Sequence, residues 1–151
     1  MRNLSVAADR RSITERISAL KSPDRALWGR MTVDQMVCHL CDAFRLPLGE
    51  KSAADMSTFF SRNILKFAAL RLPAKWPHGT PTMPEVEQGV GGTAPVEFEK
   101  DRAALLSLVD RCSKSTFDPA ILHPIFGRMS GGDWLRLGYL HADHHLRQFG
   151  R

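Results

Sequence analysis

Apolar residues recur every three or four positions along much of this chain, a spacing that predicts amphipathic helices. The first such segment covers residues 5–20, and its apolar stripe is formed by Ile13, Ile17 and Leu20. A second helix is predicted to begin at Thr32, because Thr32 and Gln35 have the spacing of a capping box, and to end before Pro47.

Two further helices follow at residues 52–70 and 96–112. In the first of these we expect the apolar residues to be buried against the other helices rather than bound to a membrane surface; they are Met56, Phe59, Phe60, Ile64, Leu65, Phe67 and Ala68. Residues 71–95 lie between the two helices and are rich in proline and glycine. This composition predicts a long connecting loop, and such loops are often functional.

The C-terminal stretch from Gly131 to Gly150 predicts the last helix. Ser130 can cap its start, Asp133 lies three residues later as the acidic half of a capping box, and Gly150 lies where the helix would stop. No segment has the clear alternation of a strand. The chain is therefore expected to form one all-α domain over residues 1–151.

Two histidines share one face of this last helix. At about 100° per residue, His141 and His145 lie within about 20° of Trp134, in the middle of a stripe that we expect to be buried, and His144 lies at its edge. Histidines spaced i, i+4 can reach one metal ion. They can equally be buried side chains with satisfied hydrogen bonds. A zinc protease is disfavoured, because Ala142 stands where that motif needs a glutamate.

His39 lies on the flank of the second helix, about 120° from Val33. From this position it faces either a neighbouring helix or solvent. Cys38 and Cys41 flank it, but a zinc ribbon would need a second such pair, which is absent. With only three cysteines in the chain, a disulfide framework is not expected, and we interpret these two as small buried residues.

Composition and charge exclude several classes of protein. The net charge is +5, but the basic residues are scattered and no nucleic-acid-binding motif is present, so we expect no nucleic-acid partner. The charge is compatible with attraction of an acidic small substrate. No run of 18 apolar residues and no signal peptide are visible, so we expect a cytoplasmic protein without a membrane partner.

Two stretches, residues 28–40 and 123–150, resemble an uncharacterised branch of the DinB-like (YfiT-like) superfamily. They include WGRMT at 28–32, HPIFG at 123–127 and HADHHLRQFG at 141–150. The resemblance implies a four-helix bundle of DinB-like topology with one long connecting loop. It also implies a divalent-metal site with one ligand from the second helix and two from the last, which here are His39, His141 and His145.

By this resemblance the protein is expected to be a metal-dependent enzyme, a thiol S-transferase or a hydrolase. Zinc or nickel would be the cofactor, alone or with a low-molecular-weight thiol, and a metal-bound water or thiol would be the nucleophile. The substrate would be a small molecule, and bundles of this kind often pair as homodimers. Residues expected in the pocket or behind the ligands are Gln35, Asp42, His144, His123 and Trp134, with Trp28 and Phe126 as further candidates.

A competing interpretation is a non-catalytic metal-binding or small-ligand-binding stress-response bundle. A closed site, with a fourth protein ligand such as His144 or His123, would favour it. An open site beside a cavity would favour the enzyme.

Overall fold

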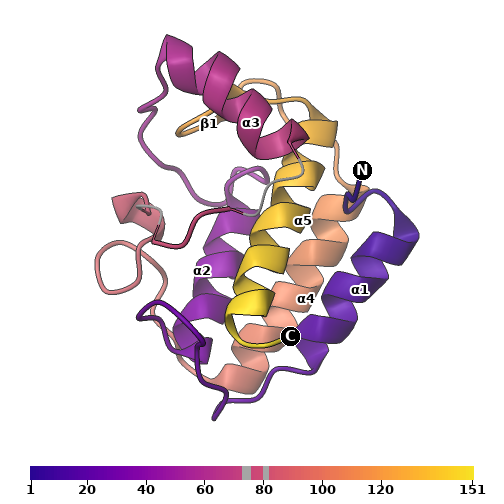
Figure 1. The fold of residues 1–151 in the computed structure, drawn as a ribbon, viewed down its shortest axis with the longest axis vertical. Helices are drawn as coiled ribbons and strands as arrows, with labels where there is room; N and C mark the ends of the chain where they lie inside the picture. The colour runs from indigo at the N-terminus through magenta and orange to yellow at the C-terminus, as the bar shows by residue number, and fades with distance from the viewer. Residues whose placement is uncertain (73–75, 80–81) are drawn as a thin grey trace.

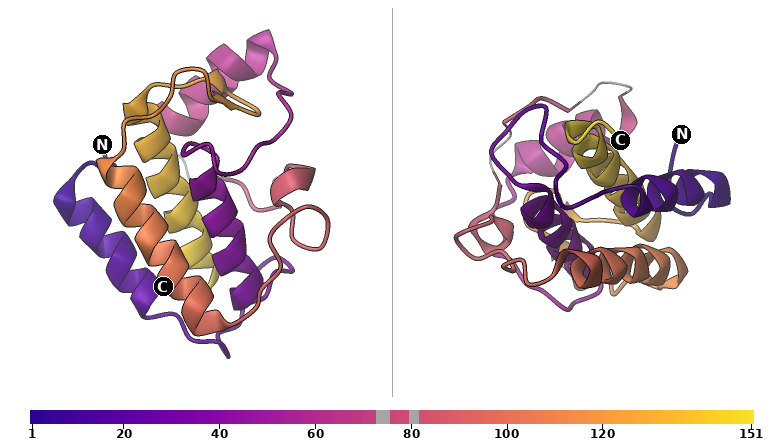
Figure 2. Two further views of the ribbon diagram at one scale, coloured as in Figure 1. Left: turned by 180° about the vertical axis from the view of Figure 1, so that it is seen from behind. Right: turned by 90° about the horizontal axis from the view of Figure 1, so that it is seen from below.

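The computed structural model describes residues 1–72, 76–79 and 82–151 and is mainly helical (Figure 1). This agrees with the predicted helical class. The four longest helices lie side by side: α1 (Ala7–Ser18), α2 (Val33–Arg45), α4 (Phe98–Lys114) and α5 (Gly131–Gln148). Helices α1 and α2 each pack against both α4 and α5, as the views from behind and below show (Figure 2).

Local sequence signals set the ends of two of these helices. The Thr32 side chain accepts a hydrogen bond from Gln35 N and the Gln35 side chain accepts one from Thr32 N, which forms the predicted capping box of α2. Ser130 and Asp133 form the same box at α5. Gly150 follows α5 with φ of +70°, a conformation that glycine adopts without strain.

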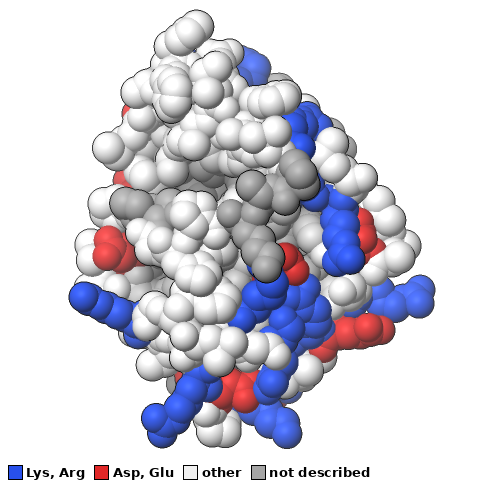
Figure 3. Space-filling view, in the orientation of Figure 1, with Lys and Arg blue, Asp and Glu red and all other residues white. Residues whose placement is uncertain are grey.

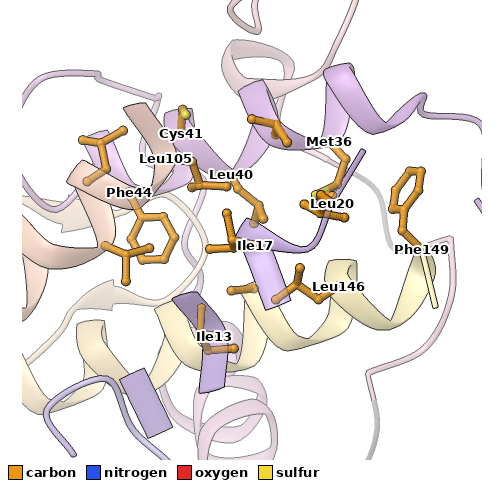
Figure 4. Close-up of a cluster of buried hydrophobic side chains, with 14 of the residues drawn as sticks. Ile13, Ile17, Leu20, Met36, Leu40, Cys41, Phe44, Leu105, Leu146 and Phe149 are labelled. Carbon is orange, nitrogen blue, oxygen red and sulfur yellow. The ribbon is translucent and has the colours of Figure 1, made fainter. Parts of the chain in front are cut away.

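The main core lies between these four helices (Figure 4). Ile13 and Ile17 of α1, Leu40 of α2, Leu105 of α4 and Leu146 of α5 are completely buried in it. Each belongs to an apolar stripe of its helix, so the periodicity of the sequence accounts for the core. The cysteines are buried and free, as interpreted from the sequence, and burial raises the pKa of each thiol to about 12.

The third helix differs from the prediction in both extent and burial. Residues 52–57 are not helical, and a π-helical turn, η1 (Ser61–Leu65), leads into α3 (Lys66–Arg71). The late start has a local cause, because Thr58 Oγ1 accepts a hydrogen bond from Ser61 N at 3.1 Å. Most apolar side chains that we expected to be buried are exposed: Met56, Phe59, Phe60, Ile64, Leu65 and Phe67.

This short helix lies across the end of α5 instead of beside the other helices (Figure 1). From such a position only one edge of it reaches the protein interior. Within α3, Leu70 is the buried residue. The expected burial of the whole apolar stripe was therefore wrong.

A small hairpin precedes α5, although no strand was predicted. Strands β1 (Leu122–His123) and β2 (Gly127–Arg128) pair antiparallel, with His123 opposite Gly127. Two residues per strand are too few for a detectable alternation of polar and apolar positions, which explains why the sequence did not reveal them.

The predicted loop at 71–95 contains a short 3-10 helix, η2 (Pro84–Val86), which packs against α2. Pro73 and Pro81 of this loop lie outside the described residues. Within the residues that the structure describes, no helix combines the length and apolar character needed to cross a membrane.

Candidate metal centre

Three histidines from two helices meet where α2 packs against α5. His39 comes from α2, and His141 and His145 come from successive turns of α5. The Nε2 atom of His141 lies 3.0 Å from Nε2 of His39 and 3.1 Å from Nε2 of His145. The side chains of His39 and His145 are buried, while His141 is partly exposed. The three imidazoles are thus close enough to bind one metal ion.

The other ring nitrogen of His39 is held by the backbone. Its Nδ1 atom lies 3.0 Å from the carbonyl oxygen of Val86, in η2. Because a carbonyl oxygen only accepts hydrogen bonds, Nδ1 carries the proton and donates it. The Nε2 atom of the neutral ring then presents a lone pair to the other two histidines.

His145 is held in the same way by a side chain. Its Nδ1 atom lies 2.8 Å from Oε1 of Gln148, and Nε2 of the same amide donates to the carbonyl oxygen of Trp28 at 2.7 Å. Gly29 makes room for this amide, since a Cβ atom there would lie 2.6 Å from Gln148 Nε2. Nε2 of His145 therefore also presents a lone pair to His141.

Electrostatics keep these rings neutral. Burial lowers the pKa of His39, and it lowers the pKa of His145 to about 3 with a further contribution from His39. The pKa of His141 lies well below its ordinary value, because the ring is desolvated and faces two other imidazoles. Neutral imidazole is the form that binds a metal.

The triad lines a cavity of about 540 Å³ between α2, α5 and α3. Of the residues proposed from the sequence to lie in a pocket, five line this cavity: Trp28, His123, Phe126, Trp134 and His144. Trp134 also belongs to a second buried cluster with Leu70, Phe126 and Met129, so it has a packing role as well.

Two of the predicted pocket residues have other roles. Gln35 does not line the cavity, because its side chain is part of the α2 capping box. Asp42 is buried, but it binds Thr93 through both the backbone N–H and the hydroxyl, at 2.7 Å each, and it lies 3.1 Å from Lys51 Nζ. It therefore secures the loop that carries η2 and does not contact a histidine ring.

His123 and His144 line the cavity but do not join the triad in the described part of the chain. His123 Nδ1 accepts hydrogen bonds from the N–H groups of Ile125 and Phe126, both at 3.1 Å, so this ring has a structural role in the hairpin. The ring of His144 lies edge-on to Trp28, with 6.1 Å between centroids.

Two residues of the long loop were assigned no role from the sequence. His78 stacks on Trp28 with ring centroids 4.1 Å apart. The ring centroids of Trp76 and His141 lie 6.0 Å apart. Both come from a segment without periodicity, so no sequence signal placed them beside the triad. Gln148 was also missed, although its position one turn after His145 was a usable signal.

A family model described as "Protein of unknown function (DUF1569)" matches residues 13–151. No curated protein and no solved structure matches the chain.

Proposed function

The chain belongs to this family of proteins of unknown function, and we propose that it is a metal-dependent enzyme in which His39, His141 and His145 hold one divalent ion. We further propose that α1, α2, α4 and α5 form a four-helix bundle of DinB-like topology. The resemblance of the 28–32, 123–127 and 141–150 stretches supports both proposals.

The donor set of the triad fits a cation. His39 and His145 both turn a lone pair toward His141, because each ring donates through Nδ1 to an oxygen. His141 Nε2 carries one proton at most, so it can satisfy only one of its two neighbours. A tetrahedral ion with bonds of about 2.0–2.1 Å would hold ligand nitrogens roughly 3.3 Å apart, close to the 3.0 and 3.1 Å between His141 Nε2 and the other two Nε2 atoms. Imidazole ligands suit zinc and nickel.

The observation that carries the enzymatic proposal is the opening of the triad into the cavity. Catalytic zinc sites have three protein ligands and leave a position for water or substrate, whereas structural sites are closed by a fourth. Neither His123 nor His144 supplies a fourth ligand, and among the described residues no other ligand completes the group. A small molecule in the cavity would reach the triad directly.

A divalent ion at this site would lower the pKa of a water molecule or a thiol beside the imidazoles and so supply a nucleophile near neutral pH. Hydrolysis and thiol S-transfer to an electrophile are the two reactions that follow. The protein's own contribution would be to keep the rings neutral by burying them and to hold their orientation through Val86 and Gln148.

Metal content tests the first part of the proposal. Wild-type protein purified without an affinity tag would be compared by mass spectrometry with His39→Ala, His141→Ala and His145→Ala, and with His78→Ala as a matched control outside the triad. We expect nearly one equivalent of metal in wild type and in the control, and loss in all three triad variants. Absence of metal from wild type after incubation with zinc or nickel would refute the site.

The open coordination position needs a separate test. Protein reconstituted with Co²⁺ would be titrated with azide and with 2-mercaptoethanol while the visible absorption spectrum is recorded. A change in the spectrum is expected, because both reagents bind directly to an ion with a free position. An unchanged spectrum in a fully loaded protein would instead favour the non-catalytic, metal-stabilised bundle.

A further inference from the structure

The cavity beside the triad is almost free of charged residues. Among the described residues that line it there is no aspartate or glutamate, and Arg30 is the one with a permanent charge. The chain's three tryptophans, Trp28, Trp76 and Trp134, all line it. This composition differs from that of the whole chain, in which a quarter of the residues are charged.

Residues 59–72, which we call the roof of the cavity, carry apolar side chains on both sides of the segment. Leu65, Ala68, Ala69 and Leu72, from η1, α3 and the residue that follows, line the cavity. The opposite side of the same segment exposes Phe59, Phe60, Ile64 and Phe67 to solvent. In the space-filling view the upper end of the molecule, where α3 lies, carries few charged side chains, whereas Lys and Arg gather on the lower part (Figure 3).

Several polar groups of the cavity wall already have partners inside the protein. His123 Nδ1 binds backbone N–H groups, Gln148 binds His145 and Trp28, and His39 Nδ1 binds Val86. A charged or strongly polar ligand would lose its water without gaining equivalent hydrogen bonds, which is costly. The Nε2 atoms of His39 and His145 instead turn their lone pairs toward His141.

From these contacts we infer that the cavity binds an uncharged, largely apolar small molecule whose single polar group lies at the triad. The inference names the substrate class of the proposed enzyme and rests on that function for the role of the polar group. The volume of about 540 Å³ is within the usual range for small-molecule sites, roughly 300–1,000 Å³. This substrate class differs from the acidic small substrate with which the net charge is compatible, because Arg30 is the one permanently charged residue among the described residues that line the cavity.

Binding of the neutral fluorescent probe N-phenyl-1-naphthylamine tests this inference. We expect saturable binding of one equivalent, with loss of tryptophan emission as the probe's emission rises, because every tryptophan lines the cavity. In competition on metal-free protein, 1-naphthol should displace the probe at a concentration at least about tenfold lower than 1-naphthoate, which carries a carboxylate in place of the hydroxyl. Equal or better displacement by 1-naphthoate would overturn the inference.

Matched variants locate the probe. Ala68→Phe places a ring inside the cavity and should weaken binding by about tenfold or more, whereas Ala103→Phe, at an exposed position of α4, should leave it within about twofold. Phe67→Ser on the outer side of the roof should also leave it unchanged. Loss of binding in Phe67→Ser with retention in Ala68→Phe would place the probe on the outer surface and refute the cavity site.

The titration is run on protein as purified and again after removal of metal by a chelator. Probe binding in both samples is expected, because the apolar wall does not depend on an ion. Probe binding without any metal uptake would leave the inferred cavity intact and refute the proposed enzyme. Metal uptake without probe binding would refute the inferred cavity site and leave the proposed enzyme intact.

Discussion

The Nδ1 atom of His145 lies 2.8 Å from Oε1 of Gln148, one turn later on the same helix. The amide nitrogen of Gln148, Nε2, donates to the carbonyl oxygen of Trp28, so the amide group cannot rotate without losing a hydrogen bond. One side chain thus fixes the orientation of a candidate ligand and ties the end of α5 to the segment before α2.

Replacing Gln148 by leucine should weaken metal binding by about 10–100-fold, as loss of an outer hydrogen bond to a ligating histidine typically does. Gln148→Glu keeps an oxygen acceptor for His145 Nδ1 and should retain most of the affinity. Competition with a chromogenic zinc chelator measures both. Equal losses in the two variants would show that Gln148 acts through packing and not through the imidazole.

Asp42 is expected to be important for stability although it binds no histidine. Burial would raise the pKa of its carboxyl, but hydrogen bonds from Thr93 and Lys51 outweigh this and keep the pKa below its usual value. Asp42→Asn should lower the free energy of unfolding by about 2 kcal/mol, because hydrogen bonds to a buried charged group typically contribute about 1.5–3 kcal/mol. Urea denaturation provides the measurement.

The control for this substitution is Asp110→Asn. Asp110 also pairs with a lysine, Lys114, at 2.7 Å, but both side chains are exposed. Loss of an exposed pair of this kind typically costs less than about 1 kcal/mol. Similar effects of the two substitutions would contradict the role of Asp42 in securing the η2 loop.

Because one side of η1 and α3 is exposed, substitutions on that side should change the free energy of unfolding much less than they would in a buried stripe. Phe67 is 60% exposed and Leu70 is 1% exposed. Phe67→Ser should change the free energy of unfolding by no more than about 0.5 kcal/mol, whereas Leu70→Ala should cost about 2–5 kcal/mol. Comparable losses in thermal or urea unfolding would mean that this segment packs as the sequence alone suggested.

Acid should destabilise the protein in part through His123. Burial, with a smaller effect from Lys66, lowers the pKa of this ring from 6.5 to about 4. The unfolded chain therefore binds a proton near pH 6.5 that the folded chain does not, and stability is complete above this pH and falls as the pH drops toward 4. The loss from this group alone amounts to roughly 3 kcal/mol.

Urea unfolding of metal-free protein at a series of pH values measures this dependence. His123→Asn, whose side-chain oxygen can still accept from the backbone, should unfold with a shallower dependence on pH than wild type. His78→Asn, at an exposed position, serves as the control and should keep the wild-type slope. Parallel curves for wild type and His123→Asn would rule out His123 as a source of the acid sensitivity.

Much of the candidate site was predictable from local pattern. The turn of a helix places His141 and His145 on one face whatever surrounds them, and the capping residues Thr32 and Ser130 mark where α2 and α5 begin. These features depend on residues within one or two turns of each other. They were therefore accessible without knowledge of the fold, as was the burial of the cysteines.

The placement of His39 depended on contacts distant in sequence. Its position on the flank of α2 allowed either solvent or a neighbouring helix, and the packing of α2 on α5 decided for the latter. The resemblance had pointed to the same residue, but periodicity could not. The partner of its Nδ1 atom, the carbonyl of Val86, is a backbone group that any residue could supply, so it leaves no mark in the sequence.

What the sequence by itself determined is the four longest helices, the apolar stripe of α1 and the pairing of two histidines on α5. Tertiary structure alone decided that the apolar residues of η1 and α3 divide between a cavity and the outer surface, and that Trp76 and His78 lie beside the triad. The physical reason is that periodicity orients a side chain about the axis of its own helix. Which faces meet is set by packing between segments far apart in the chain.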